Sequence, residues 1–364
     1  MAVKIDPKDY KLEDIESKYA SFYEPNYDIL IEGTSIKTVD AMVEHLNVDT
    51  STAKADSFTF QVFNAYDYEK SKFNWVDKFF SPGKSIEIKM GYGETLETVF
   101  EGNITSVSFQ FSESDCPIIV VSGMDISFKM MKGTKSFSWD KKKYSDVVRE
   151  IAANYTSQTV IDNTEITYEA VEQSRTSDYQ FIAWMAERSN FEFFVTGKNL
   201  FFRKPHKNKK PEVELEIGKN MIGLEINQDI GEQIGSVTVR GWNSKKKEEF
   251  QQKVQDVDKL GSGKDGAAII RELVGAGTTE YYYSNEESGD DAQKMAGFIL
   301  NKAGMKLVGG RGEWLGIPEI MAGKYLKLSG AGTNLDKLYY ITSATHILDE
   351  DGYRTSFELG GNEI

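Results

Sequence analysis

The chain contains one segment in two versions, Gly83-Lys-Ser-Ile-Glu-Ile-Lys-Met-Gly-Tyr-Gly-Glu-Thr-Leu96 and Gly323-Lys-Tyr-Leu-Lys-Leu-Ser-Gly-Ala-Gly-Thr-Asn-Leu335. Both alternate apolar and polar residues, reach a Gly-x-Gly turn, and continue through an aromatic residue into Ile104-Thr-Ser106 or Ile341-Thr-Ser343. A period of two residues is typical of a half-buried strand, and a glycine-rich turn joins two strands into a hairpin. The sequence therefore predicts the same strand, hairpin and return strand twice.

The flanks of the two copies extend the match. Phe58-Thr-Phe-Gln-Val-Phe-Asn64 precedes the first copy and Val237-Thr-Val-Arg-Gly-Trp-Asn243 precedes the second, while a further strand follows each, at Ile118–Ser122 or Thr355–Leu359. Glycine-rich hairpins look alike in many β proteins. Shared residues in the same order across three strands nevertheless favour a true repeat, which indicates two similar domains.

The remaining β pattern surrounds these copies. We expect strands at Asp28–Glu32, Phe58–Val62, Ile86–Met90, Ile104–Phe111, Pro117–Gly123, Val213–Ile217, Gly223–Asn227 and Val237–Trp242. Several short alternating strands with glycine-rich turns are typical of a barrel or a sandwich.

A helical pattern interrupts the strands from Trp139 onward, where Tyr144, Val147, Val148, Ile151 and Tyr155 recur at helical spacing. Ser177-Asp-Tyr-Gln180 is a capping box that predicts the start of a second helix. Its buried face would be formed by Phe181, Ile182, Met185 and Ala186, followed by a hairpin of Phe191–Val195 and Leu200–Arg203. These residues predict a small α+β domain.

The segment from Asn243 to Gly277 is charged and contains glycines, and it is long for a connection inside a domain. We interpret it as a mobile or partner-ordered loop. A third helix is predicted near Asp290–Ala303, with Gly304 closing it. Partner-specific contacts are expected in the region 243–303.

A length of 364 residues exceeds the size at which one hydrophobic core usually stops growing, so more than one domain is expected. The predicted fold class is β-rich α+β, with two similar tube-like β-barrels and a small inserted α+β domain. The expected boundaries are 1–26 for an N-terminal extension, 27–136 for the first barrel, 137–210 for the inserted domain and 211–364 for the second barrel, with a loop and helix insertion at 243–303.

Composition excludes several classes of function. The net charge of −14 argues against specific nucleic-acid binding, and the basic cluster Arg203–Lys210 is interpreted as a solvated loop. No apolar stretch is long enough for a membrane span, and Met1–Ala20 lacks the apolar run of a secretory signal. The single cysteine, Cys116, fits assembly in a cytoplasm and is expected to be a small buried residue.

No pattern of catalytic or ligand-binding residues emerges. His45, His206 and His346 are far apart in sequence, and His346 is interpreted as structural. Gly261-Ser-Gly-Lys-Asp265 departs from a phosphate-binding loop at its first and last positions, and Gly91-Tyr-Gly93, Gly275-Ala-Gly277 and Gly330-Ala-Gly332 lack the third glycine of a dinucleotide site. Adjacent acids such as Glu286-Glu287 carry little information among 57 acidic residues. We predict no catalytic, cofactor-binding or metal site and no enzymatic activity.

Several motifs resemble one family when taken in order. Phe100–Thr105, Ser177–Glu187, Gly316–Gly323, Leu338–Ser343, His346 and Gly352–Glu358 are similar to signatures of the late control protein D or baseplate hub family of contractile phage tails, R-type bacteriocins and related injection systems. The resemblance covers roughly Tyr27 to Gly360, and the Ser177–Glu187 motif is shared with the spike proteins of type VI secretion.

The resemblance implies a structural hub that seats the spike and nucleates the inner tube. Two like barrels in a homotrimer would give a pseudo-hexameric ring joining a trimeric spike to a hexameric tube. The expected partners are a separate spike protein, the inner tube or tube initiator, and tape-measure and wedge proteins, in a baseplate assembled in the bacterial cytoplasm. A tail-associated cell-wall hydrolase and a glycan-binding tail protein are the alternatives.

Overall fold

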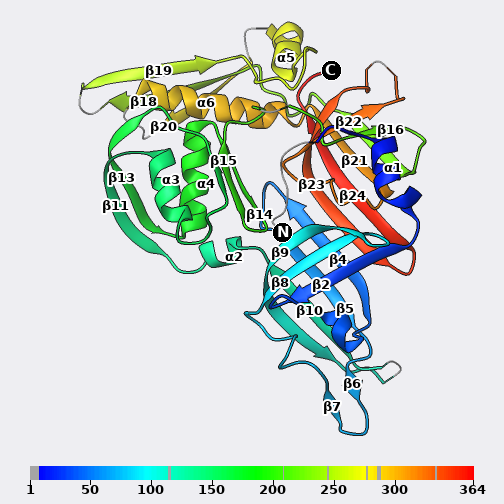
Figure 1. Ribbon diagram of the computed structural model, residues 1–364. Coiled ribbons are helices and arrows are strands. Elements are labelled where there is room, and N and C mark those ends of the chain that lie inside the picture. The colour runs from blue at the N-terminus through cyan, green and yellow to red at the C-terminus, as the bar shows by residue number, and fades with distance from the viewer. Residues whose placement is uncertain are drawn as a thin grey trace.

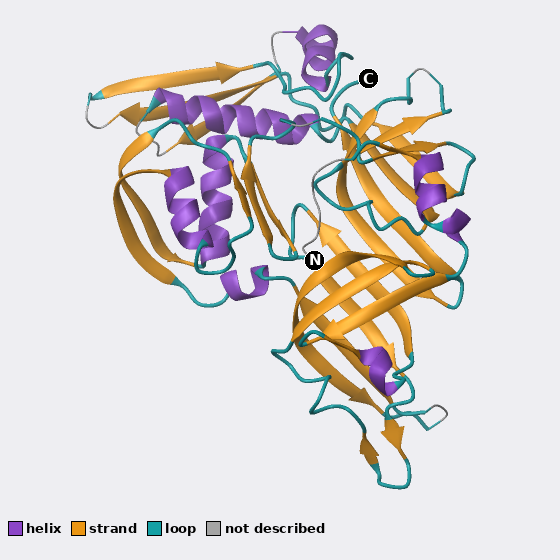
Figure 2. Cartoon of the chain, in the orientation of Figure 1, coloured by secondary structure: helices purple, strands orange, loops and turns teal. Residues whose placement is uncertain are grey.

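The computed structural model describes residues 8–113, 116–207, 209–243, 246–275, 278–284, 288–332 and 334–364. The chain is β-rich, with a mixed sheet of 14 strands and few helices (Figures 1 and 2). Figure 1 shows the blue and cyan strands of this sheet below the orange and red ones, with the green helices to one side. In the described part of the chain, no helix is both long and apolar enough to span a membrane.

Six strands form the N-terminal half of the large sheet, in the spatial order β4-β5-β10-β9-β8-β2. They are β2 (Pro25–Ile31), β4 (Val43–Ser51), β5 (Ser57–Val62), β8 (Ser85–Tyr92), β9 (Thr95–Gln110) and β10 (Ile118–Met124), with the short β3 (Thr34–Ser35), η2 (Ile36–Val39), β6 (Tyr66–Asp67) and β7 (Lys72–Phe73) beside them. The predicted alternation places Ile86, Ile88 and Met90 of β8 in the core.

Six further strands form the C-terminal half, in the order β17-β21-β24-β23-β22-β16. They are β16 (Val213–Glu216), β17 (Met221–Gln228), β21 (Val308–Leu315), β22 (Tyr325–Ser329), β23 (Leu338–Asp349) and β24 (Gly352–Gly361). Numbered by their rank along the chain, both halves have the same spatial order, second-third-sixth-fifth-fourth-first. They differ in one pairing, because β2 is antiparallel to β8 whereas β16 is parallel to β22.

The two copies of the repeated segment have the same local geometry. The Gly83 amide donates to the Ile104 carbonyl at 2.7 Å, and the Gly323 amide donates to the Ile341 carbonyl at 2.9 Å. Both glycines have positive φ, 95° and 83°. The register of β9 on β10 shifts between Ile104 and Ser106, and that of β23 on β24 shifts between Ile341 and Ser343. The repeated Ile-Thr-Ser triplet is thus a β-bulge in each half.

One proposed flank of the repeat is wrong. Val237–Asn243 lies in β18 (Ser236–Asn243), which pairs with β19 and β20 in a separate sheet rather than in the C-terminal half. Val237 and Val239 pack with Ala296 of helix α6. The true counterpart of Phe58–Val62 is β21, whose three glycines weaken its strand pattern in the sequence.

A helical region with its own hydrophobic core lies between the two halves in sequence. It comprises α2 (Ser127–Met130), β11 (Lys135–Lys143), α3 (Tyr144–Ala152), β12 (Thr159–Ile161), β13 (Thr167–Thr176), α4 (Asp178–Ser189), β14 (Glu192–Thr196) and β15 (Asn199–Arg203). The capping box is confirmed, since the Gln180 amide donates to Ser177 Oγ and the Ser177 amide to Gln180 Oε1, both at 3.2 Å. The hairpin of β14 and β15 is confirmed as well.

The interpretation of Asn243–Gly277 as a loop is wrong for much of that segment. It contains β19 (Glu248–Val254) and α5 (Gly266–Val274), and β20 (Thr279–Ser284) follows. Helix α6 (Gly289–Gly304) confirms the third predicted helix, but Gly304 is its last helical residue and Met305 is its C-cap. Residues 276 and 277 lie outside the described residues.

The N-terminal segment crosses to the far half of the sheet. It comprises β1 (Tyr10–Lys11), α1 (Leu12–Lys18) and η1 (Ala20–Phe22), and β1 pairs in parallel with β16. Figure 1 shows α1, in blue, beside the strands of the C-terminal half. The closure of each half into a barrel and the domain boundaries 1–26, 27–136, 137–210 and 211–364 stay predictions.

Alanine at the two repeated glycines should have unequal effects. Both Gly83→Ala and Gly323→Ala force a side chain into the positive-φ region, at roughly 1–2 kcal/mol. A Cβ at Gly83 meets nothing within 4 Å, whereas at Gly323 it would lie 2.4 Å from the Phe194 ring. Gly323→Ala should therefore cost about 1–3 kcal/mol more in urea unfolding. Equal losses would contradict the packing of the helical region on the second copy.

Candidate functional site

The two halves of the large sheet are joined by one strand pairing. β23 pairs antiparallel with β4, from Ser343 opposite Ser51 to Leu348 opposite Leu46. The Thr345 hydroxyl donates to Asp49 Oδ1 across the junction at 2.6 Å. Because β4 also pairs with β5, and β23 with β24, the ladder runs without a break from one half into the other.

The core side of this junction is buried. His346 of β23 is fully buried opposite Val48, and its Nδ1 lies 2.9 Å from the Tyr353 hydroxyl and 3.1 Å from Thr355 Oγ1. Burial lowers the pKa of His346 to about 3, so the imidazole is neutral near pH 7. A neutral, hydrogen-bonded histidine in a strand core acts in packing.

Helix α1 is linked to both halves by ion pairs of the partly buried Lys18. Lys18 Nζ lies 2.7 Å from Glu97 Oε1 of the N-terminal half and 2.5 Å from Glu319 Oε1 of the C-terminal half. The Tyr19 hydroxyl also donates to Glu319 Oε1, at 3.0 Å. Burial alone would lower the pKa of Lys18, but Glu319 and Glu97 outweigh it and raise the pKa. Lys18 is therefore a charged bridge between the halves.

A further ion pair, between Lys324 and Glu212, is buried. Lys324 Nζ is 3.4 Å from Glu212 Oε1 and donates to the Glu319 carbonyl at 3.2 Å. Burial lowers the pKa of Lys324 and raises that of Glu212, in both cases against the attraction of the partner. Removing either partner would leave a buried unpaired charge, which is strongly destabilising.

Two buried carboxyls meet where the N-terminal half joins the helical region. The Asp56 amide donates to Asp125 Oδ2 at 3.2 Å, and the Ser127 amide donates to Asp125 Oδ1 at 2.8 Å. Burial raises the pKa of Asp125 to about 7, and burial together with the Asp125 carboxyl raises the pKa of Asp56 well above its usual value. Like charges this close disfavour double ionisation. No sequence motif marked this pair.

The three histidines that were candidate functional residues lie in different parts of the fold. His45 is exposed on β4, His206 lies 2.9 Å from the Tyr325 hydroxyl, and His346 is in the sheet core. Among the described residues, no group of His, Cys, Asp and Glu side chains could hold a metal ion. The expected absence of catalytic, cofactor and metal sites stays a prediction.

Two local expectations need correction. Cys116 is exposed rather than buried, because it precedes the first residue of β10 and lies outside the ladder. The loop Gly261–Asp265 is anchored rather than flexible. The Gly263 amide donates to Glu363 Oε2 at 2.6 Å, and Asp265 caps α5.

Glycines in two of the glycine-rich turns have the backbone conformation that a hairpin needs. Gly93 and Gly330 have positive φ in the turns after β8 and β22, as hairpin turns require. Gly275 also has positive φ and ends α5, while the rest of Gly275-Ala-Gly277 and Glu286-Glu287 lie outside the described residues.

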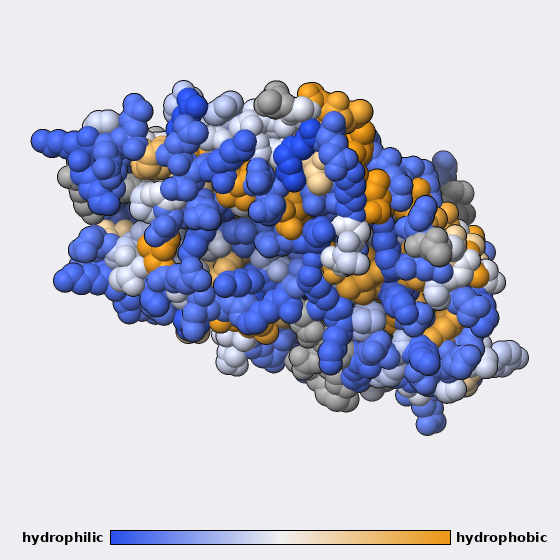
Figure 3. Space-filling model, turned by 90° about the horizontal axis from the view of Figure 1, so that it is seen from above, coloured by the Kyte–Doolittle hydropathy of each residue, from blue (hydrophilic) through white to orange (hydrophobic). Residues whose placement is uncertain are grey.

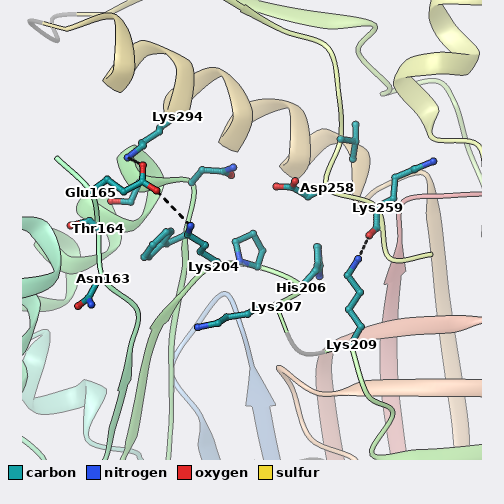
Figure 4. Close-up of a pocket in the computed structure, with 15 residues that line it drawn as sticks. Asn163, Thr164, Glu165, Lys204, His206, Lys207, Lys209, Asp258, Lys259 and Lys294 are labelled. Carbon is teal, nitrogen blue, oxygen red and sulfur yellow. Dashed lines mark hydrogen bonds and ion pairs between the residues drawn. The ribbon is translucent and has the colours of Figure 1, made fainter. Parts of the chain in front are cut away.

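A hollow of about 590 Å³ lies between α6 and the chain that leaves β15 (Figure 4). Lysines from several elements line it, namely Lys204, Lys207, Lys209, Lys259 and Lys294. Glu165 pairs with Lys294 at 3.2 Å and with Lys204 at 3.8 Å, while Lys207 pairs with Asp162 at 2.5 Å. Lys209 donates to the Lys259 carbonyl. The cationic groups thus have partners in the protein.

The basic cluster Arg203–Lys210 is only partly a solvated loop. Its described lysines are exposed, but His206 is buried and Arg203 pairs with Glu192 at 2.5 Å. Figure 3 shows a largely hydrophilic upper face with hydrophobic residues gathered in a few places. That surface fits the net charge of −14.

Solved structures of tail proteins share this fold. The 43 kDa tail protein of prophage MuSo2 from Shewanella oneidensis is 12% identical with a TM-score of 0.70, over 92% of this chain and 98% of that one. A tail protein from Neisseria meningitidis MC58 is 13% identical with a TM-score of 0.67, over 93% and 97%. The E. coli c3393 protein, a type VI secretion component, is 12% identical with a TM-score of 0.56, over 92% and 77%.

Sequence comparisons give one further match. A family model described as the Alg8 N-terminal domain matches residues 24–350. No curated protein matches the chain.

The buried Asp56–Asp125 pair should make stability depend on pH. Carboxyls whose pKa is raised by folding stabilise the protein fully at low pH, and that contribution is lost as the pH rises from about 4, the unfolded value, to about 7. The slope is up to about 1.4 kcal/mol per pH unit for each proton. Asp56→Asn removes one carboxyl and its repulsion, so its urea midpoint should fall less between pH 5 and 7.5. Parallel pH profiles would contradict a protonated pair.

Proposed function

We propose that this chain, which belongs to the Alg8 N-terminal domain family and carries one six-strand arrangement twice, is a structural baseplate hub of a contractile injection system. The fold that it shares with phage tail proteins and a type VI secretion component supports this role. The observation that carries the proposal is the direct strand pairing of the two halves through β4 and β23. On this proposal the chain is not an enzyme and belongs with the late control protein D hubs.

The proposed assembly is a homotrimer. Each copy carries two six-strand units with the same strand order, so three copies would give six similar tube-like units around a threefold axis. Such a ring matches a trimeric spike on one side and a hexameric tube on the other. It would nucleate the inner tube during assembly in the bacterial cytoplasm and remain in the baseplate of the particle.

The region 243–303 is the proposed contact site for other baseplate proteins. It adds a small sheet and two helices to the C-terminal half, and several of its apolar side chains are exposed. The exposed residues include Leu273, Val274, Tyr281 and Tyr283, with Trp242 just before them. Spike, tube-initiator, tape-measure and wedge proteins are the candidate partners.

Light scattering coupled to size exclusion tests the proposed assembly. At high protein concentration the chain of 41.0 kDa should elute as a species of about 123 kDa, because its exposed strand edges need covering. A monomer at every concentration, also when co-expressed with the neighbouring tail proteins, would contradict the trimer.

A turbidity assay on purified peptidoglycan should show no lysis, and robust lysis would contradict a structural hub.

A further inference from the structure

Within the two six-strand halves of the large sheet, two strand edges carry no partner in the part of the chain that the structure describes. The second half of β9, Ser106–Gln110, pairs with β10 on one side only, and β17 pairs only with β21. Exposed edges of this kind are ready to pair with another chain. Their counterparts in the other half of the sheet, β23 and β4, pair with each other.

The counterparts can be assigned residue by residue. The shared bulge makes Ser106 equivalent to Ser343, and therefore Phe109 equivalent to His346. On the other edge, Phe58 is opposite Val48 in the N-terminal half, and its counterpart Gly310 is opposite Ile226 in the C-terminal half. Ile226 is thus equivalent to Val48.

We propose that β17 of one copy pairs antiparallel with β9 of the next copy, in the register of the internal junction. Transferring that register places Ser106 opposite Asp229, Ser108 opposite Asn227, Phe109 opposite Ile226 and Phe111 opposite Leu224. This inference rests on the proposed ring and names the contact that closes it. At every junction, within one copy or between two copies, the second strand of one six-strand unit would pair with the fifth strand of the neighbouring unit.

The side chains on the two edges are complementary at the transferred positions. Thr345 and Asp49 share a hydrogen bond of 2.6 Å inside the chain. At the equivalent positions between two copies, Ser108 would face Asn227. In place of the buried pair His346 and Val48, they would place Phe109 and Ile226. In these two pairs a polar residue would meet a polar one and an apolar residue an apolar one, while the same register places Val107 opposite Gln228.

Residues on the two unpaired edges are more exposed than their counterparts at the internal junction, as expected if a partner strand is missing. His346 is 0% exposed and Val48 is 0% exposed, whereas Phe109 is 44% exposed and Ile226 is partly exposed. Phe111 is 66% exposed, although both phenylalanine rings also touch Phe73 of the β6–β7 hairpin. Pairing with a second copy would bury these rings as the internal junction buries its own residues.

The contact is heterologous, because different surfaces of the two copies meet. Repetition of such a contact produces either a closed ring or an open filament. The internal junction already applies the same contact once between two units of one chain. On the proposed threefold assembly, internal and external junctions would alternate around a closed ring.

Disulfide trapping tests the register. In a Cys116→Ser background, Ser108→Cys and Asn227→Cys together should form a disulfide between copies. The Thr52 amide donates to the Thr342 carbonyl at 3.1 Å, so alternation makes Thr345 and Asp49 a non-hydrogen-bonded pair. Such pairs lie about 4.5 Å apart between Cα atoms, within the range that a disulfide spans.

The matched control moves one cysteine by two residues on the same face of β9. Gln110→Cys with Asn227→Cys places the Cα atoms about 7–8 Å apart, near or beyond the range of a disulfide. On non-reducing gels the in-register variant should run as a covalent species of about 123 kDa, and the control as a species of 41.0 kDa. A trimer in light scattering with equal cross-linking of both variants would overturn the register but leave the hub proposal standing. No oligomer at all would count against both.

A charged substitution gives an independent readout. Phe109→Glu should weaken self-association by at least about tenfold, because a carboxylate would face the apolar Ile226 side chain. Val160→Glu, on the helical region with Val160 47% exposed, is the control and should leave self-association unchanged. Unchanged association of a folded Phe109→Glu variant would overturn the proposed edge contact.

Discussion

The pairing of β4 with β23 is the constraint on which the rest of the structure depends. It joins two six-strand arrangements into one sheet of 14 strands, and Thr345 and Asp49 are hydrogen-bonded across this junction. The charged bridge from Lys18 to Glu97 and Glu319 lies across the same two halves. Backbone pairing sets their relative position, and the ion pairs of Lys18 hold the N-terminal helix against both halves.

The sequence predicted the elements whose local signals agree with their packing. The capping box at Ser177 marks the start of α4, and the repeated Ile-Thr-Ser triplets at Ile104 and Ile341 mark bulges with the same geometry. The capping box forms within one turn of the chain, whereas each bulge also needs its partner strand, β10 or β24. The match between the two copies therefore reflects a common backbone geometry.

The misses have physical causes. β4 was not predicted, because His45 has a positive φ and a register shift interrupts the alternation of the strand. β21 is rich in glycine, and β19 is charged on an exposed sheet, so neither shows the apolar period of a strand. The pairing of β18 outside the large sheet depends on packing against α6, which the sequence of β18 alone does not encode.

The candidate sites were predicted less completely than the fold. Sequence reasoning placed Cys116 in the core, where the structure shows it exposed, and missed the buried Asp56–Asp125 pair. Burial of single polar residues depends on contacts between distant segments, and Lys18 meets Glu319 across 301 positions of the chain. The unpaired edges of β9 and β17 likewise become visible only once the partners of their counterparts are known.

An electron cryo-microscopy reconstruction of the assembled particle tests the central claim most directly. The account predicts three copies of this chain in a ring of six similar units, at the level where the spike meets the inner tube. It also predicts that β17 of one copy lies beside β9 of the next as a neighbouring strand of one sheet. Six copies in that ring, or a position on a tail fibre away from the tube axis, would contradict it.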